Sequence, residues 1–217
     1  MSSRHNHHVD GTRHRRPVPF EPRAFEPFEG GSDPARMSEA AHLSAAALVH
    51  GGRESQSPEV HERLIKLTER EGLEAIAELW AESPAVTLPG ALWRLYALRS
   101  SITTNPERAS ALFRDGRASA PVSTAVAGVA EPPTADELVK MADSVLSGAF
   151  NGDFDVALER AAAFCRVVAI GQTHHADATE AASARRATEF TRNSARLIKT
   201  AEQLEASARL WRRGELD

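Results

Sequence analysis

The sequence predicts an all-α fold, a helical bundle or array of about eight helices. Of its 217 residues, 38 are alanine, the residue with the strongest intrinsic preference for helices. Segments rich in valine, isoleucine, threonine and aromatic residues, which are typical of strands, are scarce. Proline directly follows a serine, aspartate or asparagine at several places, a pattern typical of helix beginnings.

The first 32 residues are predicted to form a disordered tail. They carry no helical period, and six prolines and glycines fall between Pro17 and Gly31. The tail histidines at positions 5, 7, 8 and 14 offer at most a loose metal site, so we expect a solvated segment. The phenylalanines at 20, 25 and 28 alternate with glutamates at 21, 26 and 29. A segment of this kind could dock on a partner protein or fold back on its own domain.

Residues 33–116 are predicted to form a helical subdomain. A capping residue precedes proline four times: Asp33-Pro34, Ser57-Pro58, Ser83-Pro84 and Asn105-Pro106. We expect helices at 34–49, 58–71, 73–82, 88–103 and 106–115. Glycines at positions 51, 52, 72 and 116 are interpreted as helix ends.

Residues 117–133 change in character and are predicted to be a linker. The segment contains small residues, Pro121, Gly128 and the pair Pro132-Pro133. Its three valines, at 122, 126 and 129, are candidates to lie against the core. A second helical subdomain is expected over 134–217, and we expect 33–217 to make one compact unit.

The second subdomain opens with a capping box. Thr134 and Glu137 have the spacing at which the two side chains satisfy the free amides at a helix start. A second helix is predicted over about 154–170, with the single cysteine, Cys165, on its apolar face. Gly171 is interpreted as the end of that helix.

The last predicted helix runs from Asp177 to about Arg213, a stretch without proline or glycine. Unbroken, it would span about 55 Å. Apolar residues recur in it every seven positions, which predicts an apolar seam that packs along the body or against a second copy of the chain. The seam consists of Phe190, Leu197, Leu204 and Trp211.

The same helix carries a stripe of basic residues roughly opposite the apolar seam. The basic stripe consists of Arg185, Arg192, Arg196 and Lys199. A stripe of this kind is expected to meet an acidic partner, or alternatively to follow the phosphates of a nucleic acid. Glu189 interrupts it, and a solvated helix face often has this appearance.

Two stretches, Leu88–Tyr96 and Val126–Pro133 with the helices after it, resemble an uncharacterised all-helical protein family of actinobacteria. The similarity covers roughly residues 35–214 and implies a helical cytoplasmic domain. Members of that family have been labelled polymerase subunits or phosphorylases. The residues here support neither label, because the chain has no polymerase-type aspartate triplet and no glycine-rich phosphate loop.

Metal and cofactor sites are not predicted. A di-metal site in a helical bundle needs two Glu-x-x-His pairs, and the chain has one, Glu39 with His42. The pair His174-His175 could bind a metal ion or move protons, but we favour a capping or solvated-loop role. Cys165 is interpreted as a core residue.

Two arginines near the aromatic stretch, Arg94 and Arg99, could hold the carboxylate or phosphate of a ligand. We favour the alternative that they pair with acidic residues of their own fold.

The composition limits the class of function. The 26 basic and 30 acidic residues give a net charge of −4, so no basic excess requires nucleic acid or an acidic membrane. One cysteine and no predicted membrane span favour the cytoplasm. We therefore expect a non-enzymatic helical interaction or regulatory protein without cofactors. A nucleic-acid-binding protein and an enzyme with an unrecognised pocket between helices are the alternatives.

Overall fold

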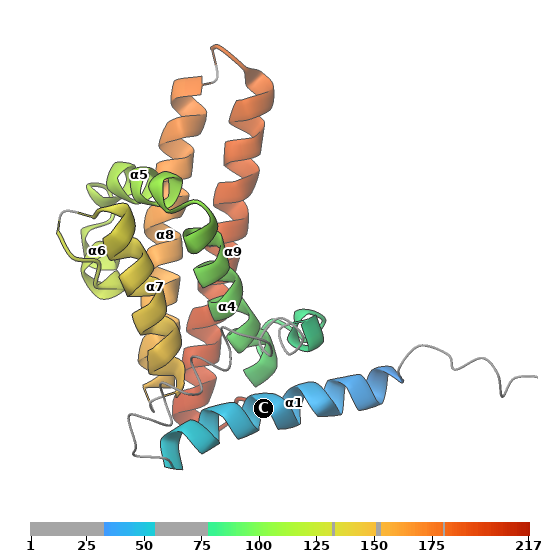
Figure 1. Cartoon of the computed structure of the whole chain (residues 1–217). Helices are drawn as coiled ribbons and strands as arrows, with labels where there is room; N and C mark the ends of the chain where they lie inside the picture. Colours follow the sequence, from blue (N-terminus) through green and yellow to red (C-terminus); the bar gives the residue numbers. More distant parts are fainter. Residues whose placement is uncertain (1–32, 55–77, 132, 151–152, 180) are drawn as a thin grey trace, which may run out of the picture. The chain divides into compact units, whose positions relative to one another are not determined.

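A computed structural model describes residues 33–54, 78–131, 133–150, 153–179 and 181–217. All of their regular structure is helical, which confirms the predicted all-α class and the long C-terminal helix (Figure 1). The helices are α1 (Pro34–Glu54), α4 (Leu88–Thr104), α5 (Pro106–Arg117), α6 (Pro121–Ala127), α7 (Ala135–Phe150), α8 (Phe154–Thr179) and α9 (Ala184–Arg213). Residues 34–217 form one compact unit. The predicted tail 1–32 and the predicted helix 58–71 lie outside the described residues.

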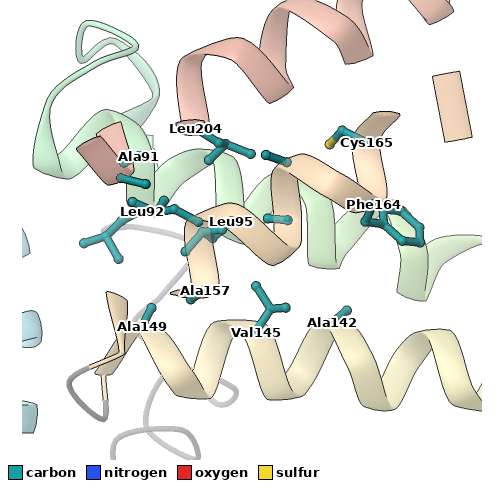
Figure 2. Packing of buried hydrophobic residues seen from close by; sticks show 14 of the residues in the cluster. Ala91, Leu92, Leu95, Ala142, Val145, Ala149, Ala157, Phe164, Cys165 and Leu204 are labelled. Carbon is teal, nitrogen blue, oxygen red and sulfur yellow. The ribbon is translucent and has the colours of Figure 1, made fainter. Parts of the chain in front are cut away.

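Helix α8 is the centre of this unit. Helices α4, α5, α6, α7 and α9 all contact it. Its side chains are buried on nearly every face, with Phe154, Leu158 and Cys165 fully enclosed. Figure 2 shows Val145 and Ala149 of α7 directed toward this central helix. The central turns of α8 are mostly apolar and need this cover, whereas polar side chains such as Glu159 and Arg166 lie at the partly exposed edge of the helix.

Helices α8 and α9 lie side by side as an antiparallel pair (Figure 1). Thr173 meets Ser194 near the turn that joins them, with 3.2 Å between the hydroxyl oxygens. At the other end Arg212 donates to Asp155 over 2.6 Å. Small buried residues on α9, Ala187, Ala201 and Ala208, allow the two helices to approach closely.

The prediction of one unbroken helix from Asp177 to Arg213 is wrong. Helix α8 continues through residue 171 to Thr179, and the chain then reverses before α9 begins at Ala184. The Ser183 hydroxyl caps the new helix by accepting from the Arg186 N–H at 3.4 Å. The break results from tertiary packing. Two helices joined by a turn can bury the small residues of α9 against α8, whereas one straight helix could not.

The interpretation of Gly171 as a helix end is also wrong, because α8 continues to Thr179. Gly116 lies in the last turn of α5, one residue before the helix ends at Arg117, so its predicted place at a helix end is confirmed. Both glycines lie where α5 crosses α8. A Cβ atom on Gly171 would lie 2.0 Å from the Leu112 carbonyl oxygen, and one on Gly116 would lie 1.9 Å from that of Val167. The two backbones are therefore in direct contact, which only glycine permits.

Local capping signals decide several helix starts. Asn105 caps α5, since its side chain accepts from the Arg108 N–H at 3.2 Å, and Thr134 caps α7 at 3.3 Å from the Glu137 N–H. The cap at Asn105 is as predicted. Of the predicted capping box at Thr134 only one half forms, because the Glu137 carboxylate accepts from Lys140 at 2.7 Å. The helix predicted over 88–103 is confirmed as α4, Leu88–Thr104, with Thr87 as its cap. The interpretation of Ser83-Pro84 as a helix start is wrong, because no helix begins there.

The segment 117–133 contains α6, which packs on α8. Of its three valines, Val129 packs against the core, whereas Val122 and Val126 are 76% and 44% exposed. The expectation that all three valines lie against the core is therefore wrong for two of them.

Candidate functional site

The basic stripe lies on the exposed face of α9. Arg185, Arg192, Arg196 and Lys199 are all exposed, and none forms an ion pair with a described residue. Arginines elsewhere in the described chain do form such pairs: Arg99 with Asp143, Arg117 with Glu131, Arg166 with Glu205 and Arg212 with Asp155 and Glu159. None of the four residues of the basic stripe is therefore neutralised by an ion pair with a described residue.

The apolar seam of α9 faces its own chain. Leu204 is fully buried, and Leu197 and Trp211 pack against the core. The Trp211 ring meets Phe154 edge-on, with 4.9 Å between centroids. Phe190 lies further along, partly buried against helices α5 and α8.

Phe190 joins the seam to a small polar cluster. The Arg108 guanidinium lies 6.0 Å from its ring centroid, and the His175 ring lies 5.4 Å away. His175 Nε2 contacts an Asp115 carboxylate oxygen at 2.7 Å, and His174 Nδ1 contacts the Asp115 carbonyl at 2.9 Å. Both histidines belong to α8 and link it to α5, so their predicted loop position is wrong.

The described residues enclose a groove of about 560 Å³ between α4, α5, α8 and α9. Its apolar wall includes Leu98, Ile102, Leu112, Phe164, Val168 and Leu197. Its polar side chains include Asn105, Arg108, Gln172, Asn193 and Arg196. Sequence reasoning missed this groove because the residues come from four helices and share no fixed spacing.

Gln172 is the unusual member of the groove. Its side chain is only 6% exposed, and its Oε1 atom has no hydrogen-bond partner among the described residues. A buried acceptor without a donor costs about 1–3 kcal/mol. Native folds keep such a group chiefly where water or a ligand completes it.

The two arginines near the aromatic stretch differ in their partners. Arg99 donates to Asp143 at 2.6 Å, as predicted. Arg94 instead donates to Gln203 Oε1 at 2.9 Å and to the Gly90 carbonyl at 2.8 Å. Burial lowers the pKa of Arg94. The predicted acidic partner for Arg94 is absent from the described residues.

Other groups with possible chemistry are placed as follows. Cys165 is fully enclosed, and burial raises the pKa of its thiol to about 12, which leaves no reactive thiolate near neutral pH. His42 Nδ1 contacts the Ser38 carbonyl at 2.8 Å on α1. Among the described residues, no three histidine, cysteine, aspartate or glutamate side chains converge on a metal position. No helix in the described ranges has the length and apolarity needed to cross a bilayer.

Comparisons with protein families, with curated proteins and with solved structures find no match to this chain. The resemblance of 88–96 and 126–133 to the actinobacterial family therefore stays a prediction.

Proposed function

We propose that this protein is a non-enzymatic helical interaction protein that binds an acidic surface of a partner protein through the basic stripe of α9. One observation carries the proposal. Arg185, Arg192, Arg196 and Lys199 share one exposed helix face and have no acidic partner in the described chain. Uncompensated charges on a rigid helix raise the local potential and steer an oppositely charged partner.

The position of the apolar seam supports a partner other than a second copy. Leu204 and Trp211 already hold α9 against its own core. A second copy that used the seam would have to displace these contacts. The basic stripe is available without any rearrangement, so we favour it as the interaction surface.

A protein partner is preferred to a nucleic acid for reasons of charge. Glu189 lies within the stripe, and the whole chain carries a net charge of −4. A carboxylate beside a phosphate backbone would oppose binding, whereas a protein surface can place a basic or neutral residue opposite it. We place this interaction in the cytoplasm, given the single buried cysteine.

The experiment compares three forms of the full chain as baits in native lysate. Arg192→Glu reverses one charge inside the stripe. Arg186→Glu makes the same change on an exposed residue of α9 outside the stripe, and serves as the matched control. We expect an acidic protein to be retained by the wild type and by Arg186→Glu, and to be lost with Arg192→Glu. Retention should also fall when salt rises from about 50 to about 300 mM.

Circular dichroism of each variant establishes that the helical fold is intact. Equal retention by wild type and Arg192→Glu would contradict the proposal. If nuclease treatment abolishes retention, the partner is a nucleic acid and the proposed protein partner is wrong.

A further inference from the structure

We infer that the groove between α4, α5, α8 and α9 is a binding site for a small organic anion with a carboxylate or phosphate head and an apolar body. The inference does not depend on the proposed function, although Arg196 belongs to both surfaces. Charge, backbone polarity, one unsatisfied buried group and an apolar wall all point to this class of ligand.

The charge of the groove is one-sided. Arg108 from α5 and Arg196 from α9 both line it, and no aspartate or glutamate does. Neither guanidinium forms an ion pair with a described residue. The hollow around Arg212, in contrast, includes Asp155, which neutralises that arginine at 2.6 Å. Two unneutralised guanidinium groups from separate helices match the oxygens of one carboxylate or phosphate.

The start of α5 adds to this field. Asn105, Arg108 and Ala109 at the beginning of this 12-residue helix all line the groove. The dipole of a helix N-terminus favours a negative charge nearby. Pro106 has no N–H and the Arg108 N–H already donates to the Asn105 side chain, so the attraction here comes from the dipole. The anionic head is therefore assigned to the end of the groove where this helix start and Arg108 lie.

Gln172 supplies independent evidence that a ligand belongs here. It lines the groove and is only 6% exposed. Its Oε1 atom accepts no hydrogen bond from the described residues. The side-chain amide can rotate about its last torsion, which exchanges the positions of its oxygen and nitrogen. An anionic head accepts hydrogen bonds, so it would pair with the amide N–H of Gln172, and a water molecule held beside the head would donate to Oε1.

The remaining wall selects an apolar body. Leu112, Phe164 and Val168 form part of it, and Leu197 closes it from α9. A volume of about 560 Å³ lies within the range of small-molecule sites, which are mostly apolar with a few placed polar groups. The site therefore fits an amphipathic anion better than a free inorganic ion.

The test is calorimetric titration of the full chain with naphthylacetate, naphthyl phosphate and the neutral naphthylacetamide. We expect saturable binding of at least one anion and at least tenfold weaker binding of the amide. Arg108→Gln and Arg196→Gln should each weaken anion binding about tenfold, the effect of losing one charge-assisted hydrogen bond. Arg192→Gln is the matched control, because Arg192 belongs to the basic stripe but does not line the groove. It should change the affinity less than twofold.

The two anions distinguish the head groups, since the tighter one identifies carboxylate or phosphate. No saturable binding of either anion up to about 5 mM, equal binding of the amide, or an equal loss with Arg192→Gln would overturn the inference. Loss of anion binding only in Arg108→Gln and Arg196→Gln supports it. Failure of this titration leaves the lysate experiment on Arg192→Glu unaffected, so the two proposals fail separately.

Discussion

A single ion pair links the middle of the α8–α9 pair. Arg166 donates from Nε to Glu205 Oε1 at 2.7 Å and from Nη2 to Glu205 Oε2 at 2.9 Å. These hydrogen bonds lower the pKa of Glu205 below its ordinary value of 4.5. About a third of each side chain is exposed, so solvent screens the pair and its net stabilisation is modest.

Acid should remove the contribution of this pair. Because folding lowers the pKa of Glu205, its stabilisation is complete above the unfolded value near 4.5 and is lost as the pH falls through the folded value. We expect Glu205→Gln to reduce the free energy of unfolding by about 0.5–1 kcal/mol at neutral pH and by less at about pH 3. Urea unfolding at both pH values measures this.

Glu82→Gln is the control for that comparison, since Glu82 is exposed and forms no ion pair with a described residue. It should leave the free energy of unfolding nearly unchanged at both pH values. A Glu205→Gln effect of the same size at neutral and acid pH would contradict the assignment.

At the scale of helices, the crossing of α5 and α8 shows why local sequence predicts some features and misses others. Asn105 and Thr134 act through hydrogen bonds within three residues, so their caps could be predicted from sequence. Gly171 acts through the Leu112 carbonyl, which is distant in sequence. In the sequence, a glycine that ends a helix looks the same as a glycine that lets another backbone approach. Only the folded structure shows which role it has.

The crossing makes a direct prediction. Gly171→Ala would place Cβ 2.0 Å from the Leu112 oxygen, so we expect a loss of about 1–3 kcal/mol in the free energy of unfolding. Gly148→Ala on α7 is the matched control. Its Cβ would lie 3.8 Å from Ala157 Cβ, an ordinary contact, so the gain in helix propensity should stabilise the fold by up to about 1 kcal/mol.

Thermal and urea unfolding of both glycine variants decide the matter. Opposite signs for the two substitutions are expected. If Gly171→Ala is as stable as Gly148→Ala, the backbones do not meet as closely as described.

For the molecule as a whole, the sequence is sufficient to predict the fold class but not to predict the groove. The all-α class follows from propensities summed over many residues, and the stripe on α9 follows from helical periodicity within one element. The groove depends on side chains as distant in sequence as Ile102 and Leu197. The residues next to Gln172 in the sequence do not predict that its side-chain amide is buried in the groove with an oxygen that lacks a donor.

The compact unit should fold without the segment that precedes it. All described core residues lie between Ala41 and Leu216, within the compact unit 34–217. We expect removal of residues 1–32 to move the thermal midpoint by less than about 2 °C, since a core contact worth 1 kcal/mol would move it by about 2–4 °C. Scanning calorimetry of both forms tests this, and a drop beyond about 4 °C would show that the segment supports the core.

The contact between Gly116 and Gly171 has one more consequence. With no side chain between the two backbones, neither helix can slide past the other without breaking the fit of main chain to main chain. The second half of α5 is thereby held against α8, and Arg108 lies on the first turn of the same 12-residue helix. An incoming anion would meet its recognition groups already in position, so little of its affinity would be spent on ordering the protein.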